Sequence, residues 1–319
     1  MKDSILKNFL VNFRTLFTTN IRREINRNAN QLASFECEVK QKLDFLNLLE
    51  YYASHEQEAR TFAEELAYLR ERGSYCNFPY PPSVTGETVR NGLDEASGLP
   101  FVVHKNKKLF FPSHFSKEDA TALYLNYLHV ERLLGVDEQD GTPHQYQSPQ
   151  VHVEEGDVVF DIGAAEGLFA LDQIDNASRV VLVESASQWM EPLRRTFAPF
   201  GDKVTFVEKL VSAVDTNKTV SLEKLLSETE FRSAFVKMDI EGCELSSISS
   251  AVNVLKEKEG VKMAVASYHR QHDADELSQL FHSLGYASEF SNGYMLFDQY
   301  DTPAPPFFRK GMIRVKKYN

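Results

Sequence analysis

Four polar residues stand where apolar runs of the chain end, namely Asp161, Glu184, Asp239 and His269. If each run is a strand of a parallel sheet, the carboxyl ends meet at one edge, and ligands of such sheets bind beyond that edge. Carboxylates there can hold cations or hydroxyl groups, and an imidazole with a pKa near neutrality can accept a proton from a substrate. These residue types predict a site that binds a polar ligand and moves a proton.

The first of these strands enters a turn with the sequence DIGAAEG at 161–167. Gly163 removes a side chain where the backbone must turn sharply beside a ligand, and Gly167 lets the next helix approach the strand. The spacing differs from the G-x-G-x-x-G of dinucleotide-binding turns, because Ala165 replaces the glycine that admits a pyrophosphate and acidic Glu166 follows it. A carboxylate repels a diphosphate, so the turn suits a cationic ligand such as S-adenosylmethionine.

A second carboxylate agrees with this interpretation. The apolar run at 179–185 ends in Glu184, about 20 residues past Gly163, where an acidic residue can bind the ribose hydroxyls of an adenosine ligand. Two neighbouring strand ends therefore indicate the same ligand. The alternative is that the glycines and Glu184 are ordinary turn residues of an α/β sheet.

The segment VKMDIEGCE at 236–244 places further charges around Asp239. Lys237 and Glu241 lie two residues to either side of Asp239, so a regular strand would put all three on one face. This cluster is either catalytic or a structural ion pair. A divalent ion on Asp239, Glu241 and Glu244 is a further alternative, but one linear motif does not supply the close oxygen geometry that such an ion needs, and we assign no metal ligand.

Strands alternating with helices must position these residues. Apolar runs predict strands at 158–160, 179–185, 204–207, 235–240 and 261–268, with helices between them, and a closing hairpin that pairs 286–290 with 294–297 across Asn292 and Gly293. This order indicates an α/β protein with a mostly parallel sheet and helices on both faces.

The sequence predicts that the chain divides into three sections, two of which precede the sheet. Apolar residues recur at helical spacing through residues 3–72, so we expect a helical N-terminal arm at 1–75 that packs on the core or on a second subunit. A connector at 76–135 contains a β-hairpin at 101–111 and a helix that begins after Ser116 and ends near residue 135. The core domain is expected at 136–319.

A polar loop at 137–150 leads into the first core strand and could lie over the ligand pocket. Its most useful side chains are His144 and Tyr146. An exposed loop histidine is more often inert than functional, so neither residue is assigned to the site.

Composition limits the classes of partner. The chain has 319 residues with a formal net charge of −11, which argues against nucleic acid, since phosphate backbones are bound by basic surfaces. Three widely spread cysteines show neither metal-ligand nor disulfide spacing, and polar residues interrupt the apolar amino end before it reaches the roughly 20 residues of a membrane span. We therefore expect a soluble cytoplasmic protein.

The run DIGAAEG, Glu184 and VKMDIEGCE resemble the FkbM family of S-adenosylmethionine-dependent methyltransferases. The resemblance covers about residues 140–319, and K-x-D-x-E-G-x-E is its specific part. It implies the seven-stranded Rossmann-like sheet of class I methyltransferases. It also implies O-methylation of a hydroxyl on a carbohydrate acceptor, such as a sugar, a glycan or a glycosylated metabolite.

The resemblance also implies roles for individual residues. Asp161, Gly163 and Gly167 would frame the methionine end of the cofactor, and Ser212 and Ala213 would flank its adenine, although packing at the strand exit explains those two equally well. The predicted cofactor-binding residues are Asp161, Gly163, Ala164, Glu166, Gly167, Glu184, Ser212 and Ala213. The predicted catalytic residues are His269 as the first candidate for general base, Asp239 as the second, Lys237 and Glu241.

Two other functions compete with this one. A nicotinamide-dependent oxidoreductase is disfavoured by Ala165 and Glu166, and a binding protein could keep the cofactor fold without catalysis. The N-terminal helices could also join two copies into a homo-oligomer.

Overall fold

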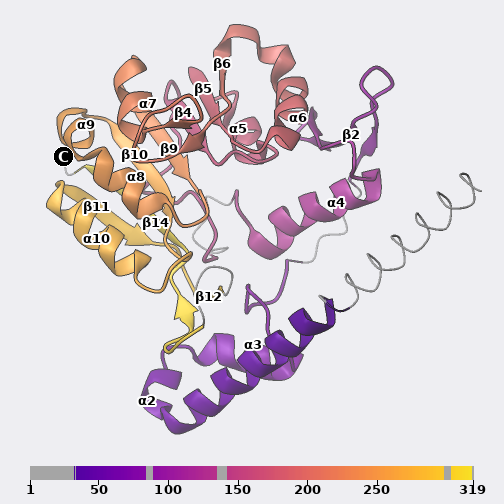
Figure 1. Cartoon of the computed structure of the whole chain (residues 1–319), viewed down its shortest axis with the longest axis vertical. Helices are drawn as coiled ribbons and strands as arrows, with labels where there is room; N and C mark the ends of the chain where they lie inside the picture. The colour runs from indigo at the N-terminus through magenta and orange to yellow at the C-terminus, as the bar shows by residue number, and fades with distance from the viewer. Residues whose placement is uncertain (1–31, 33, 84–88, 135–141, 298–302, 318–319) are drawn as a thin grey trace, which may run out of the picture. The chain divides into compact units, whose positions relative to one another are not determined.

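The computed structural model describes residues 32, 34–83, 89–134, 142–297 and 303–317 (Figure 1). These residues fall into two compact units. One contains the chain up to Thr61 together with Leu69–Tyr75, and the other contains Phe62–Tyr68 together with the chain from Cys76 onward. The second unit includes both the predicted connector and the predicted core domain.

Helices fill the described part of the predicted N-terminal arm. One helix covers residues 34–54, and α2 (Glu56–Ala59) and α3 (Ala63–Arg72) follow it. This agrees with the helical spacing of apolar residues in the sequence. The expected helix over residues 1–31 lies outside the described residues. No helix of the described ranges is both long and apolar enough to cross a membrane.

A seven-stranded sheet forms the centre of the second unit. Its strands are β4 (Val158–Ile162), β5 (Arg179–Val183), β6 (Val204–Val207), β9 (Ala234–Met238), β10 (Val261–Ala266), β11 (Tyr286–Phe290) and β14 (Met312–Lys317). Their spatial order is β11-β14-β10-β9-β4-β5-β6, and β14 alone among them runs antiparallel to its neighbours β10 and β11. The expected Rossmann-like, mostly parallel seven-stranded sheet is confirmed.

The predicted closing hairpin is wrong. β11 pairs with β14, and the residues after the Asn292–Gly293 turn form β12 (Met295–Leu296), which pairs with β13 (Phe308–Arg309) in a separate two-stranded sheet. Met312, Ile313 and Val315 of β14 are fully buried. Placing this apolar strand between β10 and β11 gives it a hydrogen-bonding partner on each side, which outweighs the local preference of the turn for a hairpin.

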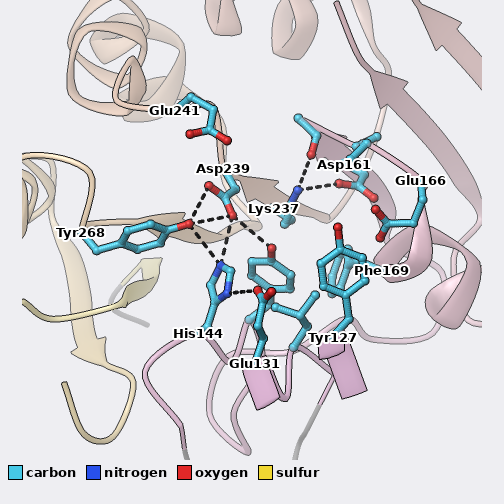
Figure 2. A pocket seen from close by; sticks show the side chains of 15 residues that line it. Tyr127, Glu131, His144, Asp161, Glu166, Phe169, Lys237, Asp239, Glu241 and Tyr268 are labelled. Atoms are coloured by element: carbon cyan, nitrogen blue, oxygen red, sulfur yellow. Dashed lines mark hydrogen bonds and ion pairs between the residues drawn. The ribbon is translucent and has the colours of Figure 1, made fainter. Parts of the chain in front are cut away.

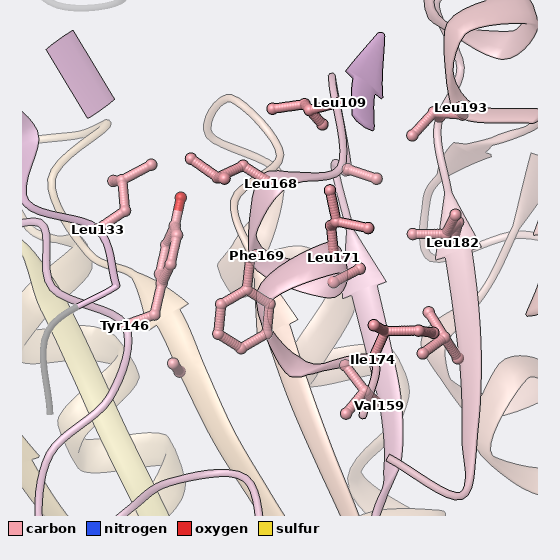
Figure 3. Close-up of a cluster of buried hydrophobic side chains, with 14 of the residues drawn as sticks. Leu109, Leu133, Tyr146, Val159, Leu168, Phe169, Leu171, Ile174, Leu182 and Leu193 are labelled. Carbon is pink, nitrogen blue, oxygen red and sulfur yellow. The ribbon is translucent and has the colours of Figure 1, made fainter. Parts of the chain in front are cut away.

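Helices cover both faces of the sheet because alternate strand residues point to opposite sides. Val159 and Phe235 pack in one apolar cluster with residues of α5 (Leu168–Gln173) and α6 (Ser187–Phe197), shown in Figure 3. Phe160 and Val236 pack in a second cluster on the other face. The helices that contribute to it are α7 (Leu222–Glu228), α8 (Glu244–Ser250), α9 (Val252–Glu257) and α10 (Asp273–Ser283).

The connector adds a hairpin and a helix to this unit. β2 (Pro100–His104) and β3 (Lys107–Phe110) form the expected hairpin, with β1 (Asn91–Leu93) on the outer edge of β2. Ser116 and Asp119 form the expected capping box at the start of α4 (Lys117–Leu125). The helix then widens into a π-helical segment, η1 (Asn126–Glu131), and so ends earlier than the sequence predicted.

Candidate functional site

A cavity of about 230 Å³ lies beyond the carboxyl ends of β4 and β9 (Figure 2). Six parts of the chain line it: η1 and the residues just after it, the loop after residue 141, the end of β4 with the turn that follows, α5, the end of β9 with the residues that follow, and the residues after β10. The lining residues are Tyr127, Glu131, Leu133, His144, Tyr146, Asp161, Gly163, Ala164, Ala165, Glu166, Phe169, Lys237, Asp239, Glu241 and Tyr268. The site is therefore at the predicted sheet edge.

The two glycines of the turn after β4 allow close packing of neighbouring backbone and side chains. Gly163 has a φ of 75°, and a Cβ there would overlap the backbone oxygen of Asp239. Gly167 caps α5 with a φ of 82°, and its Cβ would lie 2.8 Å from Leu193. The sequence attributed the absent side chain of Gly163 to a nearby ligand. In the structure, the close neighbour is the end of β9.

Lys237 ties the end of β9 to this turn. Its Nζ lies 3.2 Å from Asp161 Oδ1 and donates a 2.6 Å hydrogen bond to the carbonyl oxygen of Gly163. Burial lowers the pKa of Lys237, but Asp161 and Asp239 outweigh this effect and raise it, so the side chain stays cationic. Of the two interpretations left open for Lys237, this geometry supports a structural ion pair, and its partner is Asp161.

Two buried carboxyl groups make this end of the cavity acidic. Burial raises the pKa of Glu166 to about 7, against the attraction of Lys237, and burial also raises the pKa of Asp161. Lys237 supplies one positive charge to two carboxyl groups, so the pair carries an excess negative charge once Glu166 is ionised. A cation of the ligand can supply the missing positive charge.

Glu184 holds the backbone of the turn. One of its carboxylate oxygens accepts from Ala165 N at 2.9 Å, and the other accepts from Ala186 N at 2.7 Å. Glu184 does not line the cavity. The other predicted site residues that the cavity lining does not include are Gly167, Ser212, Ala213 and His269.

Asp239 is the centre of a hydrogen-bonded cluster at the other end of the cavity (Figure 2). Its Oδ2 lies 3.2 Å from His144 Nε2 and accepts from Tyr146 Oη at 3.2 Å, and its Oδ1 accepts from Tyr268 Oη at 3.2 Å. Burial raises the pKa of Asp239, but the hydrogen bond of His144 and the charge of His269 outweigh it and hold this pKa well below its usual range. Asp239 is therefore ionised and accepts several donors at once.

His144 bridges Asp239 and Glu131. Its Nδ1 lies 2.7 Å from Glu131 Oε2, and its side chain is buried. Burial lowers the pKa of His144, but its hydrogen bonds to the two carboxylates outweigh this effect and raise it to about 9. The imidazole is a cation at neutral pH and can release its Nε2 proton inside the cavity, and only the neutral form, which grows as the pH rises toward 9, can accept a proton there.

The loop that carries His144 and Tyr146 was expected to be exposed, whereas both side chains are buried. Their position directly before the first core strand was the signal that could have placed them in the site. Tyr127, Glu131 and Tyr268 gave no such signal, because each sits in a segment with ordinary helix or strand spacing.

His269 lies behind Asp239 rather than in the cavity lining. It is 1% exposed, its Nδ1 is 3.0 Å from Glu244 Oε1, and its Nε2 is 3.5 Å from Asp239 Oδ1 and 3.6 Å from Glu241 Oε2. Burial lowers the pKa of His269, but hydrogen bonding to Glu244 and the charge of Asp239 outweigh it and raise the pKa.

The carboxylates around His269 need a positive charge beside them. Asp239, Glu244 and His269 each offer a possible metal-ligand atom, and these atoms lie within 4.8 Å of one another. The raised pKa of His269 favours an imidazolium ion beside these carboxylates. Glu241, which is mostly exposed, lies at the rim of the cavity.

No protein-family model matches the chain, and no curated protein matches it in sequence. Solved structures resemble its fold weakly. A precorrin-6y C5,15-methyltransferase from Geobacter metallireducens is 15% identical over 53% of this chain and 84% of that one, with a TM-score of 0.37. An rRNA methylase from Streptococcus thermophilus is 13% identical over 52% and 90%, with a TM-score of 0.35. A ribosomal protein L11 methylase from Lactobacillus delbrueckii subsp. bulgaricus is 12% identical over 52% and 72%, with a TM-score of 0.33. Identities and scores this low assign no activity to the chain.

Proposed function

We propose that this protein is an S-adenosylmethionine-dependent O-methyltransferase that acts on a hydroxyl of a sugar, a glycan or a glycosylated metabolite. One observation supports the proposal: a single cavity has buried carboxyl groups beside the glycine turn at one end and a histidine–carboxylate cluster at the other. Methyl transfer to a hydroxyl needs both, because a sulfonium must be held beside an oxygen that loses its proton.

The residues present fit this cofactor. Asp161 and Glu166 would hold its ammonium and sulfonium groups. The positive charge of Lys237 would not repel these groups strongly, because Lys237 is paired with Asp161. Glu184, which lies outside the cavity lining and fixes the neighbouring turn, would accept the ribose hydroxyls with the remaining lone pairs of its carboxylate oxygens. The strand order, with antiparallel β14 between β10 and β11, is the order of class I methyltransferases and supports the same choice. The cytoplasm remains the expected location, since the spacing of the three cysteines in the sequence does not indicate a disulfide framework.

The cofactor would supply an electrophilic methyl group whose bond to sulfur breaks as the acceptor oxygen attacks it. Asp239 orients the acceptor hydroxyl by accepting its hydrogen bond. In its neutral form, whose population grows as the pH rises toward 9, His144 then takes the proton at Nε2, and Glu131 stabilises the imidazolium that forms. His269, predicted from the sequence as the base, positions Asp239 from outside the cavity. In this mechanism the sequence's second candidate, Asp239, orients the acceptor rather than accepting the proton.

A calorimetric titration tests the cofactor class. We expect the purified protein to bind S-adenosylhomocysteine in the micromolar range and to show no binding of NAD. Tight NAD binding would favour the oxidoreductase instead. Binding of S-adenosylhomocysteine without transfer to any carbohydrate acceptor would favour a non-catalytic binding protein. A positive result would justify a screen of carbohydrate acceptors.

The pKa of Glu166 predicts a pH-dependent preference for the charged cofactor. Glu166 is mostly protonated below pH 7 and mostly ionised above it, since its pKa is about 7. Only S-adenosylmethionine carries the sulfonium charge, so its affinity relative to S-adenosylhomocysteine should rise up to about tenfold from pH 6 to pH 8.

Glu166→Gln is the matched control for this titration. It keeps the shape of the side chain and removes the titration, so the ratio of the two affinities should become independent of pH. A ratio that still rises with pH in Glu166→Gln would assign the effect to another group, with Asp161 as the next candidate.

A further inference from the structure

The helix of residues 34–54, together with helical Leu32, carries an apolar stripe that no other part of the described chain covers. Five residues at three- and four-residue steps form it: Leu32, Phe35, Val39, Leu43 and Leu46, which are 58%, 63%, 39%, 55% and 59% exposed. Leu48 and Tyr52, on another side of the helix, are buried. The packed side of the helix is thus separate from the stripe, and a contiguous exposed apolar face of this kind indicates a binding surface.

Charged residues border the stripe in a regular order. At about 100° per residue, Glu36 and Lys40 fall on one flank of the stripe, and Glu38 and Lys42 fall on the other. Each flank therefore has a glutamate followed four residues later by a lysine. Lys42 lies 2.7 Å from Glu38, and Lys40 lies 3.0 Å from Asp44. Such exposed pairs along one helix are weak, so these side chains can also pair across an interface.

We propose that a second copy of this chain covers the stripe as an antiparallel helix, with the two-fold axis beside Val39. An antiparallel two-fold brings the same flank of each helix together, and a two-fold interface must be complementary to itself. The paired layers are Leu32 with the partner's Leu46, Phe35 with the partner's Leu43, and Val39 with the partner's Val39. The charge pairs are Glu36 with the partner's Lys40 and Glu38 with the partner's Lys42.

The position of the charges selects this orientation. The midpoint of each flank's glutamate and lysine lies within one residue of Val39, which is also the midpoint of the stripe. A parallel copy would bring the two different flanks together, so Glu36 would lie as near to the partner's Glu38 as to any lysine. The antiparallel arrangement aligns apolar layers and opposite charges in the same register.

Sedimentation velocity on the full chain tests the interface. At about 1 to 100 µM we expect a dimer whose fraction rises with concentration. Val39→Lys puts two lysines at the two-fold axis and should leave only monomer. Gln41→Lys adds the same charge about 200° around the helix and should leave the dimer unchanged. Both positions are exposed, so neither variant disturbs the packing of the monomer.

Charge reversals test the register. Glu36→Lys and Lys40→Glu each place like charges across the interface and should each weaken the homodimer about tenfold. A mixture of the two variants restores opposite charges at both symmetry-related positions, so a heterodimer of normal affinity should form. A purely structural effect of either substitution would not be rescued by mixing.

A cross-link gives a direct readout. In a Cys37→Ser background, Val39→Cys should form a disulfide-linked dimer under mild oxidation, and Gln41→Cys should not. A chain that stays monomeric at about 100 µM, or a dimer that Val39→Lys leaves intact, would overturn the proposal. In the first outcome no second copy would cover the stripe.

Discussion

Replacing His144 by glutamine is expected to lower the rate of methyl transfer by about 10²–10⁴-fold while the affinity for S-adenosylhomocysteine stays nearly unchanged. Glutamine can still donate a hydrogen bond to Asp239 but cannot accept a proton at neutral pH. In the unaltered protein the rate should rise with pH and level off near pH 9, because the neutral imidazole is the reactive form. His144→Gln should lose this rise.

Glu131→Gln tests the role of the second carboxylate. Removing its charge removes one of the interactions that raise the pKa of His144, so the pH at which the rate levels off should move down. A merely structural role for Glu131 would lower the rate without moving this pH. His269→Gln should keep the pH profile. If His269→Gln lost the profile and His144→Gln kept it, the base would be His269, as the sequence predicted.

The pKa of His144 also sets the pH range in which the rates of these variants can be compared. The folded pKa of His144 is about 9, above the ordinary histidine pKa of 6.5, so its ion pairs stabilise the protein fully below about pH 6.5. That contribution is lost as the pH rises through 9. Circular dichroism at each pH should therefore accompany the rate measurements.

Lys237→Met is expected to lower the free energy of unfolding by about 3–5 kcal/mol, because it leaves the buried Asp161 carboxylate without its ion pair. Methionine has nearly the same volume, so packing is kept. The loss should be smaller at pH 5 than at pH 8, since a buried unpaired carboxyl group takes up a proton as the pH falls and thereby loses its charge. Urea unfolding at the two pH values measures both effects.

A double variant provides the control. Asp161→Asn combined with Lys237→Met removes both charges, so it should unfold less easily than Lys237→Met alone. If the two substitutions were additive, Lys237 would act through its hydrogen bond to Gly163 and not through Asp161.

Local patterns were sufficient to predict the strand, turn and helix from β4 to α5. The signals were a buried apolar run, a glycine with positive φ and a capping glycine, and each of them depends only on residues that are close together in the sequence. Asp161 and Asp239 were likewise predicted together, because parallel strands bring their carboxyl ends to one edge. The same rule did not separate His269, which lies behind Asp239, from Tyr268, which lines the cavity, since a residue just after a strand can point to either side of the sheet edge.

Long-range pairing was not predictable from these patterns. His144 reaches Asp239 from 95 positions earlier in the chain, and no periodicity relates the two. The hairpin prediction failed for the same reason. β11 pairs with β14, which lies further along the chain, and not with the residues just after the turn. Burial of an apolar strand on both faces decides which strands pair. The apolar sequence of one strand does not identify its partner.

The π-helical segment Asn126–Glu131 has a consequence for how this chain tolerates deletion. The wider turn changes the rotation of the helix just before Glu131, which contacts His144. Deleting one of the residues 126–130, whatever its side chain, would let the segment return to ordinary α-helical turns and would change the position of Glu131 relative to the imidazole. At this point the number of residues matters to the site as much as their identity.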